Sequence, residues 1–180
     1  MPIQPEDLKK FLDPGFLGDL EARPVDDVRS TRATVQQAEM AVSYVRRLIQ
    51  GRLDIVEAER RSRAESPGED TSEDRVQRLP EILADAPRAA GPGRLPMQMD
   101  PGDEAAVLVA NLDRAVDPVR LSDPKSLSDE DLLAVAAKLR ELEHEVSGQR
   151  RVLHERLDAL QAELVRRYRS GEASVDALLT

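Results

Sequence analysis

Two sets of polar residues with the same order and spacing dominate the chemistry that this sequence could carry. Each set holds Glu, Ser, Arg, Gln or His, and Asp, separated in turn by four, three, four and four positions. The first set is Glu39, Ser43, Arg46, Gln50 and Asp54. The second set lies 104 residues later and comprises Glu143, Ser147, Arg150, His154 and Asp158. At about 100° per residue, each set falls within an arc of roughly 80° on a helix and forms one polar stripe.

The repeat preserves residue identity as well as polarity. Aligning residues 43–59 with 147–163 leaves 8 of 17 positions identical, including a pair of arginines and an Arg-Leu-Asp tripeptide. A charged coiled coil ordinarily carries polar stripes whose i,i+4 pairs stabilise the helix, without fixed residue identities. The double motif therefore indicates a binding site, and a purely structural stripe is the alternative.

The residue types of the motif suit a guanine nucleotide that carries phosphate. A guanidinium binds phosphate oxygens through two parallel hydrogen bonds. A carboxylate such as that of Asp54 or Asp158 accepts two hydrogen bonds from the N1–H and the exocyclic amine of guanine. The hydroxyls of Ser43 and Ser147 suit a phosphate or a ribose.

Composition and spacing predict that two long helices position these residues. The chain has 180 residues, of which 34% are charged and 2% aromatic, a composition typical of long helices and coiled coils. Apolar residues at three- and four-residue spacing run through 24–64 and again through 128–170. A helix of this length cannot bury its apolar seam alone. We therefore predict an all-α fold, an antiparallel two-helix coiled-coil hairpin, with Arg52 and Gln149 as register-setting or locally hydrated seam positions.

In such a hairpin the two motifs fall at the same level, related by a pseudo-twofold axis near Arg46 and Arg150. Glu39 would then lie beside Asp158, and Asp54 beside Glu143. The two guanidiniums would repel each other unless an anion lay between them. A twofold-symmetric, anionic ligand that contains guanine is expected, and cyclic di-GMP meets this description.

The remaining segments are predicted to be less regular. Residues 1–23 hold a short amphipathic piece and two phenylalanines, Phe11 and Phe16, which either dock a partner or cap the helical core. Residues 65–127 form a long insert with one or two short helices, at 75–84 and 103–116. Residues 171–180 form a short tail, and Gly171 is placed to end the second long helix.

The net charge and the absence of several sequence motifs reduce the number of functions expected for this protein. A net charge of -9 argues against direct DNA binding and suits a basic protein partner. No Cys is present, no apolar run approaches a membrane span, and the N-terminus does not read as a signal peptide, so we expect a cytoplasmic protein without a membrane segment. Without a Gly-rich phosphate loop or a set of metal ligands, we expect no enzyme.

The pattern Glu-x3-Ser-x2-Arg-x3-Gln-x3-Asp resembles the cyclic-di-GMP signature of RsiG-type anti-sigma factors of sporulating actinobacteria, also called aerial mycelium formation proteins. The resemblance covers both long helices and the 104-residue offset between the motifs. The second copy departs from the pattern once, with His154 in place of Gln. His154 can still donate one hydrogen bond.

The resemblance implies a fold, a ligand and a partner. It implies an antiparallel coiled coil that holds a pair of cyclic di-GMP molecules through the ten motif residues. The loaded protein would capture a sigma factor of the flagellar, developmental type and keep it from RNA polymerase and DNA. The alternative function is a structural or scaffolding coiled coil with no nucleotide ligand.

Overall fold

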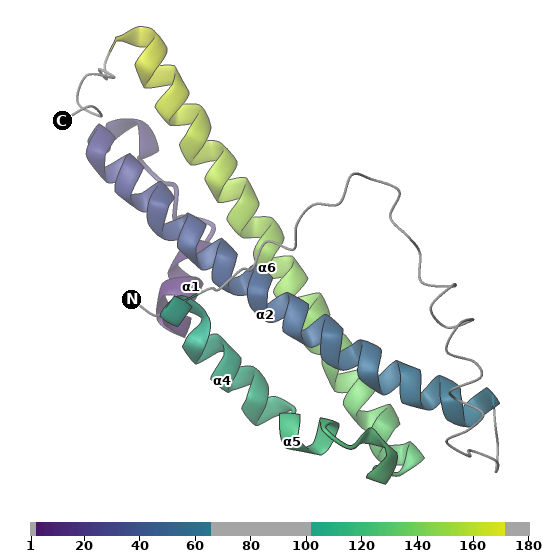
Figure 1. Ribbon diagram of the computed structural model, residues 1–180. Helices are drawn as coiled ribbons and strands as arrows, with labels where there is room; N and C mark the ends of the chain where they lie inside the picture. The colour runs from purple at the N-terminus through teal and green to yellow at the C-terminus, as the bar shows by residue number, and fades with distance from the viewer. Residues whose placement is uncertain (1–2, 66–101, 172–180) are drawn as a thin grey trace.

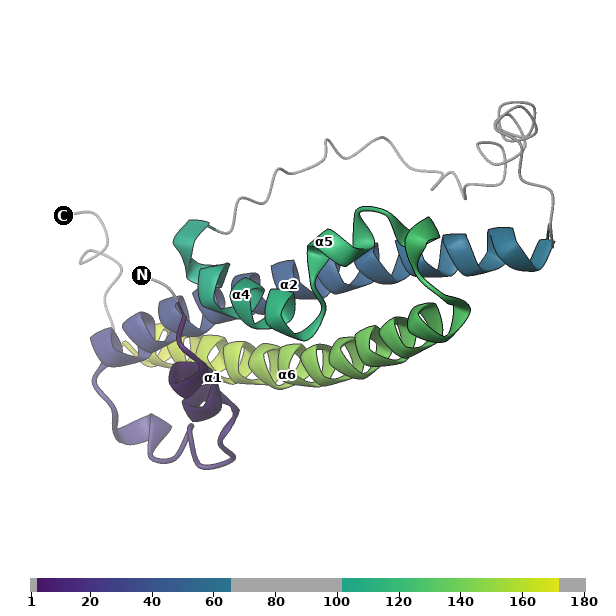
Figure 2. The same ribbon diagram turned by 90° about the horizontal axis from the view of Figure 1, so that it is seen from below.

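The computed structural model describes residues 3–65 and 102–171, and all regular elements in these ranges are helical. Two long helices, α2 (Val25–Glu65) and α6 (Asp129–Ser170), lie side by side and antiparallel (Figure 1). The shorter α-helices are α1 (Pro5–Leu12), α4 (Ala106–Ala115) and α5 (Pro118–Leu121). The predicted all-α, two-helix hairpin is confirmed. The side of the hairpin against which α1 and α4 pack is called the covered face below (Figure 2).

The interface between α2 and α6 is an aliphatic seam with a seven-residue repeat. On α2 its fully buried members are Val28, Val35, Val42, Ile49 and Val56. On α6 they are Leu132, Leu139, Leu153 and Leu160. Each exposes at most 1% of its surface, and burying a side chain of this size is worth about 1.5–3 kcal/mol. The seam therefore joins the helices and decides which of their faces point outward.

The long helices begin and end within a residue of the predicted bounds because local signals set their ends. The Ser128 Oγ atom accepts a hydrogen bond from the backbone N–H of Asp131 at 3.1 Å and so caps the start of α6. Hydrogen bonds from the Ser128 hydroxyl and the Arg120 guanidinium hold the pKa of Asp131 below its usual value. At the other end of α6, Gly171 has a φ of 78°, which glycine adopts without strain.

Helix α1 and the turn that follows it pack onto the hairpin. Phe11 is 6% exposed, and its ring meets that of Phe16 edge-on with the centroids 5.3 Å apart. Of the two roles predicted for these rings, the structure supports capping of the helical core. Arg167 of α6 anchors the segment by donating hydrogen bonds to three backbone carbonyls between residues 20 and 23.

Arg167 belongs to a buried ion pair. It is 4% exposed, and its Nε donates to Glu163 Oε1 at 2.6 Å, with Glu163 itself 7% exposed. The guanidiniums of Arg166 and Arg167 lower the pKa of Glu163 to about 2. A buried ion pair is tolerated where its other hydrogen-bonding groups are satisfied, and the backbone carbonyls of the N-terminal segment satisfy Arg167. The pair thus links the end of α6 to the start of the chain.

The described part of the predicted insert is folded along the hairpin. The helical pattern predicted over 103–116 is confirmed as α4, which a 3-10 turn at Gly102–Ala105 precedes. The side chains that bury this segment against α2 and α6 are Leu112, Val116, Leu121 and Leu127. The helix predicted at 75–84 and the tail beyond Gly171 lie outside the described residues.

Two seam arginines 104 residues apart, Arg52 and Arg156, have equivalent partners. Arg52 donates to the backbone carbonyl of Val116 at 3.0 Å and pairs with Asp113. Arg156 donates to the backbone carbonyl of Asp13 at 3.1 Å. Val116 and Asp13 are the C-caps of α4 and α1, where the helix dipole favours a cation. Arg52 therefore positions α4, and the pseudo-twofold relation of the long helices extends to the two helices that cover them.

Candidate ligand-binding site

The first half of the site joins Arg46 of α2 to the second motif on α6. Arg46 Nε donates to Glu143 Oε1 at 3.0 Å and to Ser147 Oγ at 2.8 Å. Ser147 Oγ donates in turn to Glu143 Oε1 at 2.9 Å. Gln50 Nε2 donates to the same carboxylate oxygen at 3.4 Å. One carboxylate therefore collects hydrogen bonds from three motif side chains across two helices.

The second half repeats this arrangement with the helices exchanged. Arg150 Nε donates to Glu39 Oε1 at 3.1 Å and to Ser43 Oγ at 2.9 Å. Ser43 Oγ donates to Glu39 Oε1 at 2.6 Å. His154 Nε2 lies 3.1 Å from Glu39 Oε1, in the place that Gln50 takes in the first half. The structure thus relates the motifs by a pseudo-twofold axis, and His154 makes the contact that its Gln counterpart makes.

The last residue of each motif behaves differently. Asp54 and Asp158 are exposed, and within the described residues neither carboxylate has a hydrogen bond or an ion pair. Asp54 borders a hollow of about 420 Å³ that is also lined by Gln50, Leu53, Arg140 and Glu143. An exposed carboxylate without a protein partner keeps its acceptor positions for a ligand.

The contacts between the two long helices agree with the predicted register to within a few residues. The sequence predicts Glu39 beside Asp158, and the structure places His154, the motif residue one turn earlier on α6, 3.1 Å from Glu39 Oε1. The predicted nearness of Asp54 and Glu143 holds, because both line the same hollow. Helix lengths locate the ends of a hairpin only to within a few residues. The packing of the seam and the Arg–Glu pairs then fix the register within that range.

The expectation that Arg46 and Arg150 need an anion between them is corrected. Each guanidinium is paired with a glutamate of the opposite helix, so the two charges are compensated within the protein. Among the described residues these bonds use only Nε. The side chains remain 32% and 40% exposed. Their terminal nitrogens can therefore donate to a phosphate while Nε stays bonded to glutamate.

Taken together, these groups could donate hydrogen bonds to an anion and accept them from a group that carries N–H donors. Guanidinium donors, serine hydroxyls and free carboxylates stand on one open face, here called the stripe face and defined by the ten motif residues. Arg140 lies outside the two motifs and also lines the hollow beside Asp54. Its position seven residues before Ser147 places it on the same stripe and could have identified it.

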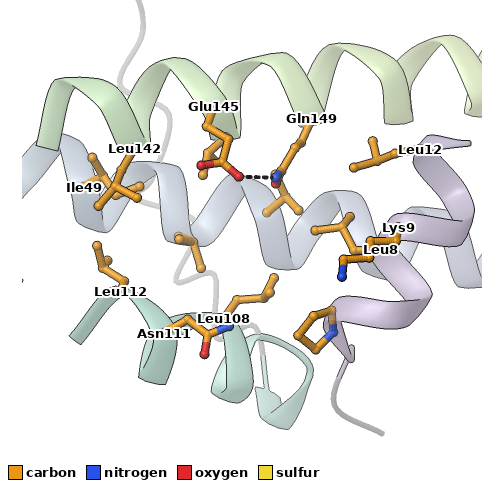
Figure 3. A pocket seen from close by; sticks show the side chains of 14 residues that line it. Leu8, Lys9, Leu12, Ile49, Leu108, Asn111, Leu112, Leu142, Glu145 and Gln149 are labelled. Atoms are coloured by element: carbon orange, nitrogen blue, oxygen red, sulfur yellow. Dashed lines mark hydrogen bonds between the residues drawn. The ribbon is translucent and has the colours of Figure 1, made fainter. Parts of the chain in front are cut away.

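A second hollow of about 270 Å³ lies on the covered face (Figure 3). It is bordered by α1, α2, α4 and α6, and leucines such as Leu8, Leu108 and Leu142 line it. Gln149, a predicted hydrated seam position, lies at this hollow and donates to Glu145 at 3.1 Å. None of the ten motif residues lines it. A charged ligand is therefore better matched by the stripe face than by this hollow.

The fold and site define a helical binding protein with a duplicated polar site. Within the described ranges, no cluster of three or more His, Cys, Asp and Glu could hold a metal ion. The helices described here also include none with the length and apolar character needed to cross a membrane.

Comparison with known proteins places the chain in a family. The family model described as RsiG-like matches residues 14–83 and 118–180, which is more than half of the chain. The chain belongs to the RsiG-like family, a membership that indicates an anti-sigma factor with a sigma factor as its partner. A search of curated proteins gives no significant match.

Proposed function

We propose that this protein is an anti-sigma factor whose capture of a sigma factor depends on cyclic di-GMP bound to the stripe face. The observation that carries the proposal is the reciprocal bonding of Arg46 to Glu143 and of Arg150 to Glu39. This arrangement holds two partly exposed guanidiniums in equivalent positions. A purely structural stripe requires no such equivalence.

The motif residues divide into ligand-binding and positioning roles. Arg46 and Arg150 bind phosphate oxygens through their terminal nitrogens. Asp54 and Asp158 accept hydrogen bonds from the N1–H and the exocyclic amine of guanine. Glu39 and Glu143 hold the arginines in place, and the Ser hydroxyls stand beside them for a phosphate or ribose oxygen. Gln50 and His154 complete the two halves. Two halves of this kind suit a pair of cyclic di-GMP molecules.

The regulatory step is binding without catalysis. The loaded hairpin captures a sigma factor of the flagellar, developmental type and so keeps it from RNA polymerase and DNA. The net charge of -9 supports this partner, because a sigma factor presents basic surfaces to DNA. Because the partner acts with RNA polymerase, we place the protein in the cytoplasm. The resemblance of its motif to that of RsiG-type anti-sigma factors suggests a sporulating actinobacterium as its source.

Isothermal titration calorimetry of the full chain with cyclic di-GMP tests the proposal. Cyclic di-AMP is the matched control ligand, and both titrations are repeated with the sigma factor present. We expect guanine-specific binding that becomes tighter with the sigma factor, because coupling between two sites is reciprocal. Absence of heat in both titrations, with and without the sigma factor, would leave a structural coiled coil as the better description.

A further inference from the structure

The two halves of the stripe face differ at one ion pair, which joins Arg140 to Glu57. With the 104-residue offset, Arg140 corresponds to Gln36, and its partner Glu57 corresponds to Gln161. The other residues around the first hollow, Gln50, Leu53, Asp54 and Glu143, correspond to His154, Leu157, Asp158 and Glu39. The half that contains Asp54 therefore holds a guanidinium where the other half holds a neutral amide.

Arg140 is positioned to contact a ligand. It lines the hollow with Asp54 and Glu143, and its side chain is 55% exposed. Its NH2 group is bonded to Glu57, which reaches across from α2 and fixes the arginine at the level of Asp54. At the other half, Gln36 accepts a hydrogen bond from Arg32 at 3.4 Å, one turn further from the motif.

We propose that Arg140 is an additional ligand-binding residue that makes the half-site around Asp54 the tighter of the two for cyclic di-GMP. The inference rests on the proposed function. An added guanidinium contributes a charge-assisted hydrogen bond to a phosphate oxygen, and such bonds are stronger than those between neutral groups. The first cyclic di-GMP molecule therefore occupies the Asp54 half, and the second occupies the Asp158 half.

The test is calorimetric titration of the full chain with cyclic di-GMP for wild type, Arg140→Gln and Gln36→Arg. Arg140→Gln reproduces the residue of the other half. It should weaken the tighter binding step about tenfold, the effect of losing one charge-assisted bond. Gln36→Arg should strengthen the weaker step. As a control, Arg32→Gln also removes one positive charge, at a position one turn from Gln36 and further from the motif. This variant should change the affinity for cyclic di-GMP less than about twofold.

A second comparison separates ligand contact from a structural role. Glu57→Gln removes the partner of Arg140 while keeping the arginine. A ligand contact predicts equal or tighter binding for this variant, whereas a structural ion pair predicts the same loss as Arg140→Gln. Combined with Asp54→Ala, Arg140→Gln should show non-additive losses because the two residues share a half-site. Combined with Asp158→Ala, its effect should be additive.

The outcomes separate this inference from the function on which it rests. The role of Arg140 is refuted and the proposed function stands if wild type binds cyclic di-GMP, Arg46→Ala binds it much more weakly and Arg140→Gln binds it as wild type does. Wild type that does not bind cyclic di-GMP with or without the sigma factor would refute both. Equal losses for Arg140→Gln and Glu57→Gln would also overturn the assignment.

Discussion

The stripe face and the covered face each carry a pair of arginines 104 residues apart, yet the pairs have different partners. On the stripe face, Arg46 and Arg150 bond side-chain carboxylates and remain 32% and 40% exposed. On the covered face, Arg52 is 14% exposed, and both Arg52 and Arg156 bond backbone carbonyls at helix ends. A carbonyl at a helix C-terminus fixes the position of that helix, whereas an exposed guanidinium held by a carboxylate remains available to a ligand. Under the proposed function, the bonding partner of each arginine therefore distinguishes a structural arginine from a ligand-binding one.

Arg46→Ala tests whether the exposed arginines of the stripe face bind ligand, and its effect is expected to be the largest. Cyclic di-GMP affinity should fall about a hundredfold, since a charge-assisted phosphate contact and half of the reciprocal pairing are lost. The free energy of unfolding should change by less than about 1 kcal/mol, because the pair is partly exposed. Calorimetry and urea denaturation measure the two quantities. A loss of helicity by circular dichroism would mean that Arg46 belongs to the core.

Arg52→Ala should lower the stability of the fold and leave the affinity for cyclic di-GMP nearly unchanged, the opposite of Arg46→Ala. Removing a largely buried guanidinium leaves Asp113 and the Val116 carbonyl without their partner, which should lower the free energy of unfolding by about 2 kcal/mol. Cyclic di-GMP affinity at low temperature should stay within about threefold of wild type, because Arg52 does not border the stripe-face hollow. Urea denaturation and calorimetry test both expectations. A variant that folds stably but does not bind would contradict the division between the two faces.

The ion pair of Glu163 and Arg167 makes the stability of the folded protein depend on pH in the acid range. The pKa of Glu163 is lowered to about 2 in the folded protein. The pair therefore contributes its full stability above the unfolded pKa of about 4.3 and loses it as the pH falls toward 2. Between pH 5 and pH 3, the melting temperature of wild type should fall more steeply than that of Glu163→Gln. Parallel pH profiles would show that the pair does not contribute this stability.

Asp54→Ala tests whether Asp54 binds the guanine base, and its expected effect is the smallest. Loss of the carboxylate should reduce the preference for cyclic di-GMP over cyclic di-AMP about tenfold, the value of one discriminating base contact. Affinity for cyclic di-AMP should change little. Competition calorimetry with the two dinucleotides measures the ratio. Equal weakening toward both ligands would remove the guanine-binding role of Asp54.

The helices were predictable because their signals are local. Ser128 and Gly171 mark the ends of α6, and the spacing of apolar residues identifies both long helices. The pseudo-twofold relation followed from the repeat itself. Helix lengths gave the register to within a few residues, and the contacts of Glu39 and Asp54 between the helices agree with it. Arg52 could not be assigned to α4 in advance, since its partners lie more than 60 residues away in sequence.

Each hydrogen-bonded side chain of the motifs either bonds a residue of the other long helix or supports a side chain that does so. If a ligand binds residues of both helices, its release is therefore expected to loosen the contact between the two helices. Under the proposed function, ligand residence time and the lifetime of the closed hairpin are linked quantities, because a ligand that binds only the folded form stabilises it. Resistance to proteolysis would then report the concentration of the second messenger.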